Sequence, residues 1–342
     1  MFCTSVLSRP FLLLAIASLS FGSTSASAEE DLIDIKLESC LMKRIKTAPD
    51  SKTVGELRKE CKTSLKGKLP ENPGVISERF AQERSTLFDP YVITPHKMNY
   101  ILPVTVTDDL NRGAYRAFND WADELQTTEA KMQISFKVPL NTDSLFVDND
   151  ALFFGFTLQS WWQVYSDNIS KPFRETNYQP EFFYTTPLDW SLGGSNSAFM
   201  VGVEHQSNGR SQAISRSWNR IYLNWLFEYE DFALSFKPWY RIPEDKKTDP
   251  MQSDGDDNRD IDDFMGYFEL GMAYKWDEYE FQFRGHHNSS TRRGGAELGF
   301  TFPLWGKLRG YAQYFGGYGE SLIDYNHSQN RFGIGIALTD ML

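Results

Sequence analysis

The 342-residue chain has little cysteine and little histidine, with three and five residues respectively. Beyond its first 28 residues no apolar run approaches the roughly 18 residues that a membrane helix needs, so no transmembrane helix is expected. The chain also lacks an excess of basic residues, since 35 Lys and Arg stand against 46 Asp and Glu, for a net charge of −11. This balance argues against a nucleic-acid partner. Aromatic residues, at 15%, are plentiful instead.

The first 28 residues have the features of an export signal. Arg9 supplies a positive amino-terminal region, residues 11–21 form a short apolar stretch, and Ala26-Ser27-Ala28 is a cleavage motif. The mature protein is therefore expected to begin at Glu29 and to reside outside the cytoplasm. Export combined with many aromatic residues and few long apolar runs is typical of an outer-membrane β-barrel.

Residues 29–88 form a separate segment that is rich in Lys and Glu and contains no Trp or Tyr. Weak helical periodicity occurs around residues 32–42 and 54–61. We expect a small periplasmic extension, with a disulfide between Cys40 and Cys61 because export exposes both to an oxidising compartment. Two unpaired thiols are the alternative.

From His96 onward the chain is built of segments in which apolar residues alternate with small or polar ones. Phe232, Leu234 and Phe236, for example, are separated by smaller or polar residues, as expected of a strand with one lipid-facing side. The twelve segments are 97–106, 130–140, 150–166, 178–186, 198–207, 215–228, 231–242, 263–274, 279–287, 294–302, 307–316 and 329–340. Their even number, and the alternation of long connections with tight turns, predict an all-β fold over residues 89–342: a twelve-stranded antiparallel transmembrane β-barrel. A secreted β-sandwich or β-hydrolase is the alternative, since sequence alone does not orient the two faces.

The most informative short segment contains His205, Ser207 and, twelve residues after the serine, Asn219. Residues two apart share a face only on a β-strand. If the flanking strands form a hairpin centred near Gln212, Asn219 lies opposite His205 with roughly 4.5–5.5 Å between their Cβ atoms. A hydroxyl, an imidazole and an amide on one surface are the minimum set for acyl transfer, namely nucleophile, general base and a group that fixes the tautomer of the base. Each residue alone is more often a structural hydrogen-bonding group.

The loop between these strands has further candidate functional groups. The Asn208-Gly209 pair permits a positive φ and exposes backbone amides, so Gly209 is a candidate oxyanion donor. Hydroxyl and carbonyl oxygens at Ser211 and Ser215 are of the hard kind that calcium accepts. An acidic run at residues 254–260 follows the seventh predicted strand; it lacks the spacing of an EF-hand, and a solvated acidic loop is the alternative.

The run HQSNGRSQAISRSWNRIY at residues 205–222 resembles the signature of the outer-membrane phospholipase A family, calcium-dependent hydrolases built on a twelve-stranded barrel. Other segments resemble the family too: SWWQ at 160–163, PFRETNYQPEFF at 172–183, KPWY at 237–240, GGAELG at 294–299 and GYGESLIDYN at 317–326. The resemblance covers about residues 89–342, and residues 29–88 fall outside it.

The resemblance implies a phospholipase A1/A2 in the bacterial outer membrane that hydrolyses sn-1 and sn-2 acyl esters of phospholipids and lysophospholipids, with its active site at the external leaflet. It implies that Ser207 is the nucleophile, His205 the general base and Asn219 the group that orients the imidazole. Two alternatives remain from the residues themselves. One is a passive barrel such as a small porin or adhesin, and the other is a different outer-membrane esterase, for instance one that deacylates lipid A.

The resemblance also implies a Ca²⁺ cofactor and regulation by assembly, with a resting monomer and an active homodimer. Ser170 matches the calcium ligand that one subunit contributes across the dimer interface, and Arg210, through its carbonyl, and Ser215 match ligands from the other subunit. Asp257 matches a carboxylate of a second site that the family uses in the monomer. There the chain departs from the pattern, because Gln212 replaces an aspartate; the departure counts against the monomer-type site and not against the dimer-type site.

Overall fold

The computed structural model describes most of the chain from residue 37 to residue 339. The described residues are 37, 40–42, 44–46, 48–49, 51–65, 74–86, 92–116, 120–188, 195–249, 252, 255–306 and 308–339. The predicted export signal at residues 1–28 therefore lies outside the described residues, as do Asp254 of the acidic run and the side chain of Gln212.

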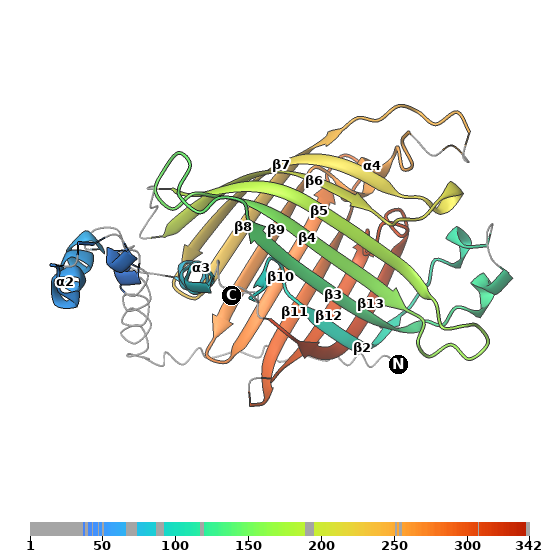
Figure 1. Cartoon of the computed structure of the whole chain (residues 1–342). Coiled ribbons are helices and arrows are strands. Elements are labelled where there is room, and N and C mark those ends of the chain that lie inside the picture. Colours follow the sequence, from blue (N-terminus) through green and yellow to red (C-terminus); the bar gives the residue numbers. More distant parts are fainter. Residues whose placement is uncertain are drawn as a thin grey trace, which may run out of the picture.

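Twelve long antiparallel strands close into a barrel (Figure 1). Each strand from β4 to β13 pairs with its neighbours in chain order, β13 pairs with β2, and β2 and β4 both pair with β3, which completes the closure. The strands are β2 Tyr100–Thr107, β3 Thr128–Pro139, β4 Ala151–Trp162, β5 Phe173–Leu188, β6 Asn196–Ser207, β7 Ser217–Tyr229, β8 Phe232–Ile242, β9 Phe268–Trp276, β10 Tyr279–Asn288, β11 Arg293–Trp305, β12 Leu308–Tyr318 and β13 Ser328–Ala337. A short strand β1, Thr94–Pro95, adds to β3. The predicted all-β barrel of twelve strands is confirmed.

One predicted strand begins later than expected. Residues 263–274 were predicted as a strand, but the structure has helix α4, Ile261–Met265, followed by β9 from Phe268. Asp262 and Asp263 lie in the first turn of α4, where acidic side chains stabilise a helix. Gly266 separates the two elements with a φ of 68°, and a Cβ at this position would lie 2.3 Å from a backbone carbonyl oxygen of β10. The early part of this prediction is therefore wrong, since the aromatic and apolar residues before Gly266 belong to a helical turn.

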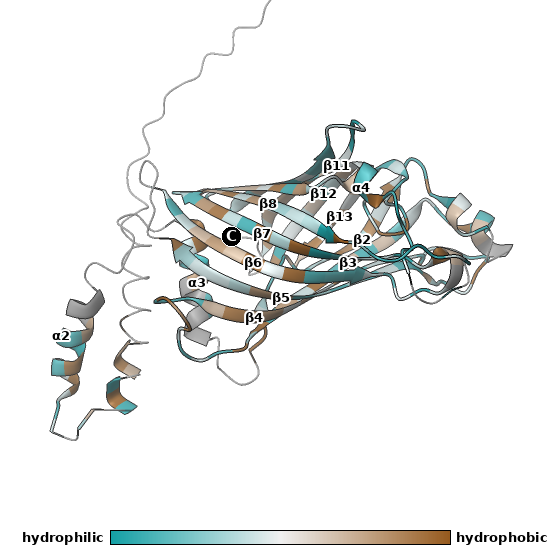
Figure 2. Cartoon of the chain, turned by 90° about the horizontal axis from the view of Figure 1, so that it is seen from above, coloured by the Kyte–Doolittle hydropathy of each residue, from teal (hydrophilic) through white to brown (hydrophobic). Residues whose placement is uncertain are grey.

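The apolar side chains of the strands face outward. Val201, Val203, Ile221 and Phe332 are each more than a third exposed, whereas charged residues such as Glu204 are buried inside. Figure 2 shows hydrophobic and hydrophilic residues alternating along the strands. An apolar exterior around a polar interior is the arrangement of a barrel in lipid, and it excludes the β-sandwich alternative, in which the polar faces would meet water. No described helix is both long and apolar enough to cross a membrane.

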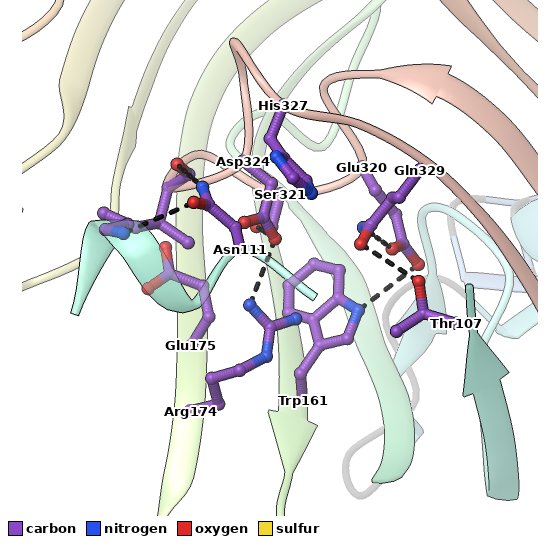
Figure 3. A network of polar contacts seen from close by, with 12 residues as sticks. Thr107, Asn111, Trp161, Arg174, Glu175, Glu320, Ser321, Asp324, His327 and Gln329 are labelled. Carbon is purple, nitrogen blue, oxygen red and sulfur yellow. Dashed lines mark hydrogen bonds and ion pairs between the residues drawn. The ribbon is translucent and has the colours of Figure 1, made fainter. Parts of the chain in front are cut away.

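An ionic network lies inside the barrel between strands β3, β5 and β13 and the connection from β12 to β13. Figure 3 shows the part of it around Arg174, Asp324 and Glu320. Arg174 contacts Glu129 at 3.0 Å and Asp324 at 3.1 Å, and all three side chains are at most 1% exposed. Glu320, which is equally buried, accepts from Arg331 at 2.8 Å. These paired buried charges hold the connection against the inner wall.

The residues before the barrel include the helices α2 (Val54–Leu65) and α3 (Val75–Thr86). Cys40 and Cys61 form a disulfide with 5.8 Å between their Cα atoms, which confirms the predicted pairing. Helix α3 lies at one mouth of the barrel (Figure 1). The backbone amide of Ser77 donates to Glu228 of β7 at 2.8 Å, and Lys137 of β3 pairs with Glu83 at 2.6 Å. Helix α3 is therefore attached to the barrel by polar contacts on two strands.

Candidate active site

The hairpin of β6 and β7 carries the candidate catalytic groups. Its register pairs His205 with Asn219 and Ser207 with Ser217, and the short 3-10 helix η3, Gln212–Ile214, lies in the connecting loop. The predicted pairing of His205 with Asn219 is confirmed.

His205 and Ser207 share the outer face of β6. Alternation along the strand puts them on the same side as the exposed Val201 and Val203, while Glu204, which lies between Val203 and His205, is buried inside the barrel. Asn219 lies in turn on the same side of β7 as the exposed Ile221. All three candidate groups therefore lie on the lipid-facing wall, near the end of the strands where the 208–216 loop begins.

A hydrogen bond joins two of the three groups, since Nδ1 of His205 lies 2.8 Å from Oδ1 of Asn219. An amide oxygen only accepts, so Nδ1 carries the proton and donates it to Asn219. In this tautomer the other ring nitrogen, Nε2, has a free lone pair, which a general base needs in order to accept the proton of a hydroxyl. The hydroxyl of Ser207 has no hydrogen-bond partner among the described residues, and its side chain, like that of His205, is half-buried.

The loop after Ser207 is shaped by two adjacent residues. Gly209 has a φ of 62°, and a Cβ there would lie 3.1 Å from the ring of Tyr178 on β5. Asn208 is 2% exposed; it donates to the carbonyl of Ile214 at 2.8 Å and accepts from the backbone amide of Arg216 at 2.9 Å. Sequence reasoning missed this role of Asn208, although an Asn before a Gly is a frequent turn signal. The buried amide thus closes the loop and fixes the backbone at Gly209.

The predicted calcium ligands are distributed around this loop. Ser215 donates to Oδ2 of Asp257 at 2.7 Å, so these two are brought together. Arg210 uses its guanidinium to hold the carbonyl of Phe173 at 2.9 Å. Ser170 lies apart from them in sequence, exposed in the turn before β5.

The donor chemistry at the loop suits calcium only in part. Hydroxyl and carbonyl oxygens of the kind present at Ser170, Arg210 and Ser215 are ligands that calcium accepts. The carboxylate of Asp257, however, is already neutralised by an ion pair with Lys247, so a cation there would have to displace an ammonium group. No group of three or more His, Cys, Asp or Glu among the described residues is arranged to hold a metal ion. The loop oxygens fit calcium chemically, and the carboxylate of Asp257, also a ligand type that calcium accepts, is paired with Lys247 in this structure.

One polar partner of the candidate catalytic groups was not found from the sequence. Nδ2 of Asn219 donates to Oε1 of Glu244 at 2.8 Å, and Glu244 lies in the connection that follows β8. The sequence offered no signal for this contact, because an acidic residue in a long loop is usually solvated.

A closed twelve-stranded barrel with an apolar exterior and a polar interior defines the class of outer-membrane β-barrel proteins. The phospholipase A1 family matches residues 76–338. Among curated proteins, phospholipase A1 of Klebsiella pneumoniae is 39% identical over 254 residues, which cover 74% of this chain and 84% of that protein. The Escherichia coli (strain K12) phospholipase A1 is 37% identical over 273 residues, covering 80% and 89%.

Solved structures agree with the sequence comparison. The outer membrane phospholipase A of Escherichia coli superposes with a TM-score of 0.69 at 38% identity, covering 75% of this chain and 95% of that one. A Salmonella typhi outer membrane phospholipase, described as a dimer with bound calcium, superposes with a TM-score of 0.68 at 37% identity, covering 74% and 94%. This chain therefore belongs to the phospholipase A1 family. The predictions of the family, of a carboxylic ester hydrolase and of an outer-membrane location are confirmed.

Proposed function

We propose that this phospholipase cleaves acyl esters of phospholipids in the outer leaflet with Ser207 as nucleophile, His205 as general base and Asn219 as the residue that orients the imidazole. The observation that carries the proposal is the 2.8 Å hydrogen bond between His205 and Asn219 on the lipid-facing wall of the barrel. An Escherichia coli relative whose structure superposes on this chain at 38% identity is described as an active-site mutant with alanine in place of an asparagine. That description agrees with an asparagine among the catalytic groups here.

The proposed reaction follows from the tautomer of His205. Nε2 takes the proton of the Ser207 hydroxyl as Oγ attacks the ester carbonyl carbon, and Asn219 stabilises the resulting imidazolium through Nδ1–H. The backbone N–H of Gly209 is the donor proposed for the oxyanion of the tetrahedral intermediate. Collapse of the intermediate expels the lysophospholipid alkoxide, which recovers a proton from His205. Water, activated by the same imidazole, then releases the fatty acid from Ser207.

The substrate range of the proposal includes both sn-1 and sn-2 esters, and lysophospholipids as well. An active site on the outer wall receives an acyl ester directly from the lipid phase. The apolar surface of Val201, Val203 and Ile221 beside the site provides the contact for acyl chains. Residues 29–88 are proposed to remain on the periplasmic side as an extension of the barrel.

We further propose that calcium and dimerisation activate the enzyme. Ser170 of one copy, with the Arg210 carbonyl and Ser215 of a second copy, would hold the ion beside the nucleophile, and a calcium ion there supplies positive charge to the oxyanion. The Salmonella typhi relative described as a calcium-bound dimer supports this part. The chain's own contribution is the 208–216 loop, closed by Asn208, which carries the oxygens of Arg210 and Ser215 directly after Ser207 in the chain. A resting monomer would lack the ligand from its partner.

The test uses full-length protein refolded in detergent micelles and measures fatty acid release from a phospholipid. Ser207→Ala is expected to lower kcat by at least about 10³-fold, by analogy with the loss of a nucleophilic serine in other hydrolases. Ser235→Ala is the matched control, because that serine faces the barrel interior and donates a hydrogen bond to Asn224, away from the candidate site. Calcium chelation is expected to abolish activity and to reduce crosslinked dimer. Hydrolysis that persists in Ser207→Ala would contradict the catalytic assignment, and activity in metal-free monomer would contradict the regulatory part.

A further inference from the structure

The carboxamide of Asn219 is held from both sides. Its oxygen accepts from Nδ1 of His205 at 2.8 Å, and its nitrogen donates to Oε1 of Glu244 at 2.8 Å. His205, Asn219 and Glu244 thus form a continuous row of three groups. Glu244 is half-buried, and it enters the site from the connection after β8, which is separate in sequence from the loop of the β6–β7 hairpin.

We propose that Glu244 is a positioning residue of the active site, which sets the rotation of the Asn219 carboxamide and through it the tautomer of His205. The inference deepens the proposed function and rests on it. The amide oxygen and the NH₂ group are nearly equal in shape, so the fold of β7 alone does not choose between the two rotations.

The two rotations have opposite chemical consequences. With the oxygen toward His205, Nδ1 carries the proton and Nε2 is free to accept one from Ser207. With the NH₂ group toward His205, Nδ1 becomes the acceptor, the proton moves to Nε2, and the base is lost. A carboxylate has only acceptors, so Glu244 draws the NH₂ group to itself and leaves the oxygen for His205.

The segment that carries Glu244 is fixed against the acidic loop. The backbone amide of Asp256 donates to the carbonyl of Asp245 at 2.8 Å, and Lys246 and Asp256 form an isolated β-bridge. Lys247 pairs with Asp257, and both of these side chains are about one tenth exposed. These contacts, on the residues directly after Glu244, hold its backbone next to Asn219.

Gly255 makes that attachment possible. Its φ is 100°, and a Cβ there would lie 2.8 Å from the carbonyl oxygen of Asp245. Any L-residue would therefore meet both backbone strain and a steric clash at this point. The ion pair with Lys247 also gives Asp257 a role as anchor of this segment.

The experiment compares Glu244→Ala and Glu244→Gln with Asp245→Asn as the matched control, because the Asp245 side chain is exposed in the same segment. Phospholipid hydrolysis in micelles with added calcium is measured to separate kcat from KM, and heat-modifiable migration confirms that each barrel is folded. Glu244→Ala is expected to lower kcat about tenfold, the effect of losing one hydrogen bond to a charged group, with KM unchanged. Glu244→Gln, which retains an acceptor oxygen, is expected to recover kcat to within about threefold of the parent.

A parental kcat in Glu244→Ala would overturn the inference, and so would equal losses in Glu244→Gln and Glu244→Ala. A loss in Asp245→Asn equal to that in Glu244→Ala would overturn it as well, since the effect would then belong to the loop. Ser207→Ala, assayed in parallel, separates this inference from the proposed function. If Ser207→Ala is inactive and Glu244→Ala is fully active, only the role of Glu244 is refuted. If Ser207→Ala is active, the catalytic assignment is refuted, and the role of Glu244 that rests on it is refuted as well.

Discussion

Replacing Asn219 by alanine tests the arrangement of the site at its centre. The change removes the hydrogen bond to His205 and leaves the carboxylate of Glu244 without its amide partner. Both groups are half-buried, so water can reach them and replace part of what is lost. A hydrogen bond in such a setting is worth about 1–2 kcal/mol, which corresponds to a fall of about 5- to 30-fold in kcat.

The magnitude relative to Ser207→Ala is the sharper test. Loss of the nucleophile removes the covalent route entirely, whereas loss of the orienting amide leaves an imidazole that still samples the correct tautomer. Asn219→Ala is therefore expected to lie well above Ser207→Ala in activity and well below the parent enzyme. The assay is fatty acid release from phospholipid in detergent micelles with calcium, at equal amounts of folded barrel.

The control for this prediction is Asn224→Ala on the same strand. Asn224 faces the interior and accepts from Ser235 at 2.8 Å, so its loss should leave kcat unchanged. Parental activity in Asn219→Ala would refute the role of the amide. An activity as low as that of Ser207→Ala would refute the magnitude, since it would mean that water does not substitute for the amide.

Three further predictions concern the loop, the interior and the extension. Gly209→Ala should reduce kcat by more than about tenfold while leaving the barrel folded. A non-glycine residue at the Gly209 φ of 62° costs about 1–2 kcal/mol of backbone strain and shifts the proposed oxyanion donor. An unchanged kcat would count against Gly209 as that donor. Burial alone would raise the pKa of Glu320, but Arg331 and a second buried cation outweigh it and lower that pKa to about 2. Ionised Glu320 therefore stabilises the folded barrel fully above the ordinary glutamate pKa, and this stabilisation is lost as the pH falls toward 2. Glu320→Gln should lower the unfolding temperature at neutral pH, measured by heat-modifiable migration. An unchanged temperature would contradict this prediction. Reduction of the Cys40–Cys61 disulfide should leave phospholipid hydrolysis unchanged, because the bond lies outside the barrel, and a loss of activity on adding reductant would show otherwise.

The barrel could be predicted from the sequence because its signals are local. Alternation with period two marks a strand wherever one face meets lipid and the other meets a polar interior. The pairing of His205 with Asn219 followed from the same period and from the short loop between them, and the structure has that register. The orientation of the faces needed the structure, which exposes Val203 and buries Glu204.

The parts that escaped prediction depend on contacts between distant segments. Helix α4 ends at Met265, and the chain then turns at Gly266, where only glycine fits because a side chain would collide with the backbone of β10. No pattern in the sequence near Gly266 reports that neighbour. Glu244 reaches Asn219 because the long connection after β8 folds back on itself, so that Asp245 contacts Asp256 and Lys247 contacts Asp257. The polar contacts of α3 with Glu228 likewise join residues far apart in the chain.

The placement of the proposed site on paired strands would tie catalysis to correct assembly. If β6 shifted by a single position against β7, the imidazole would no longer face the amide, and one partner would turn toward the lumen. A misassembled barrel of this kind would keep most of its backbone ladder yet be inert. Under the proposed function, enzymatic turnover therefore requires that these two strands have paired in their native alignment.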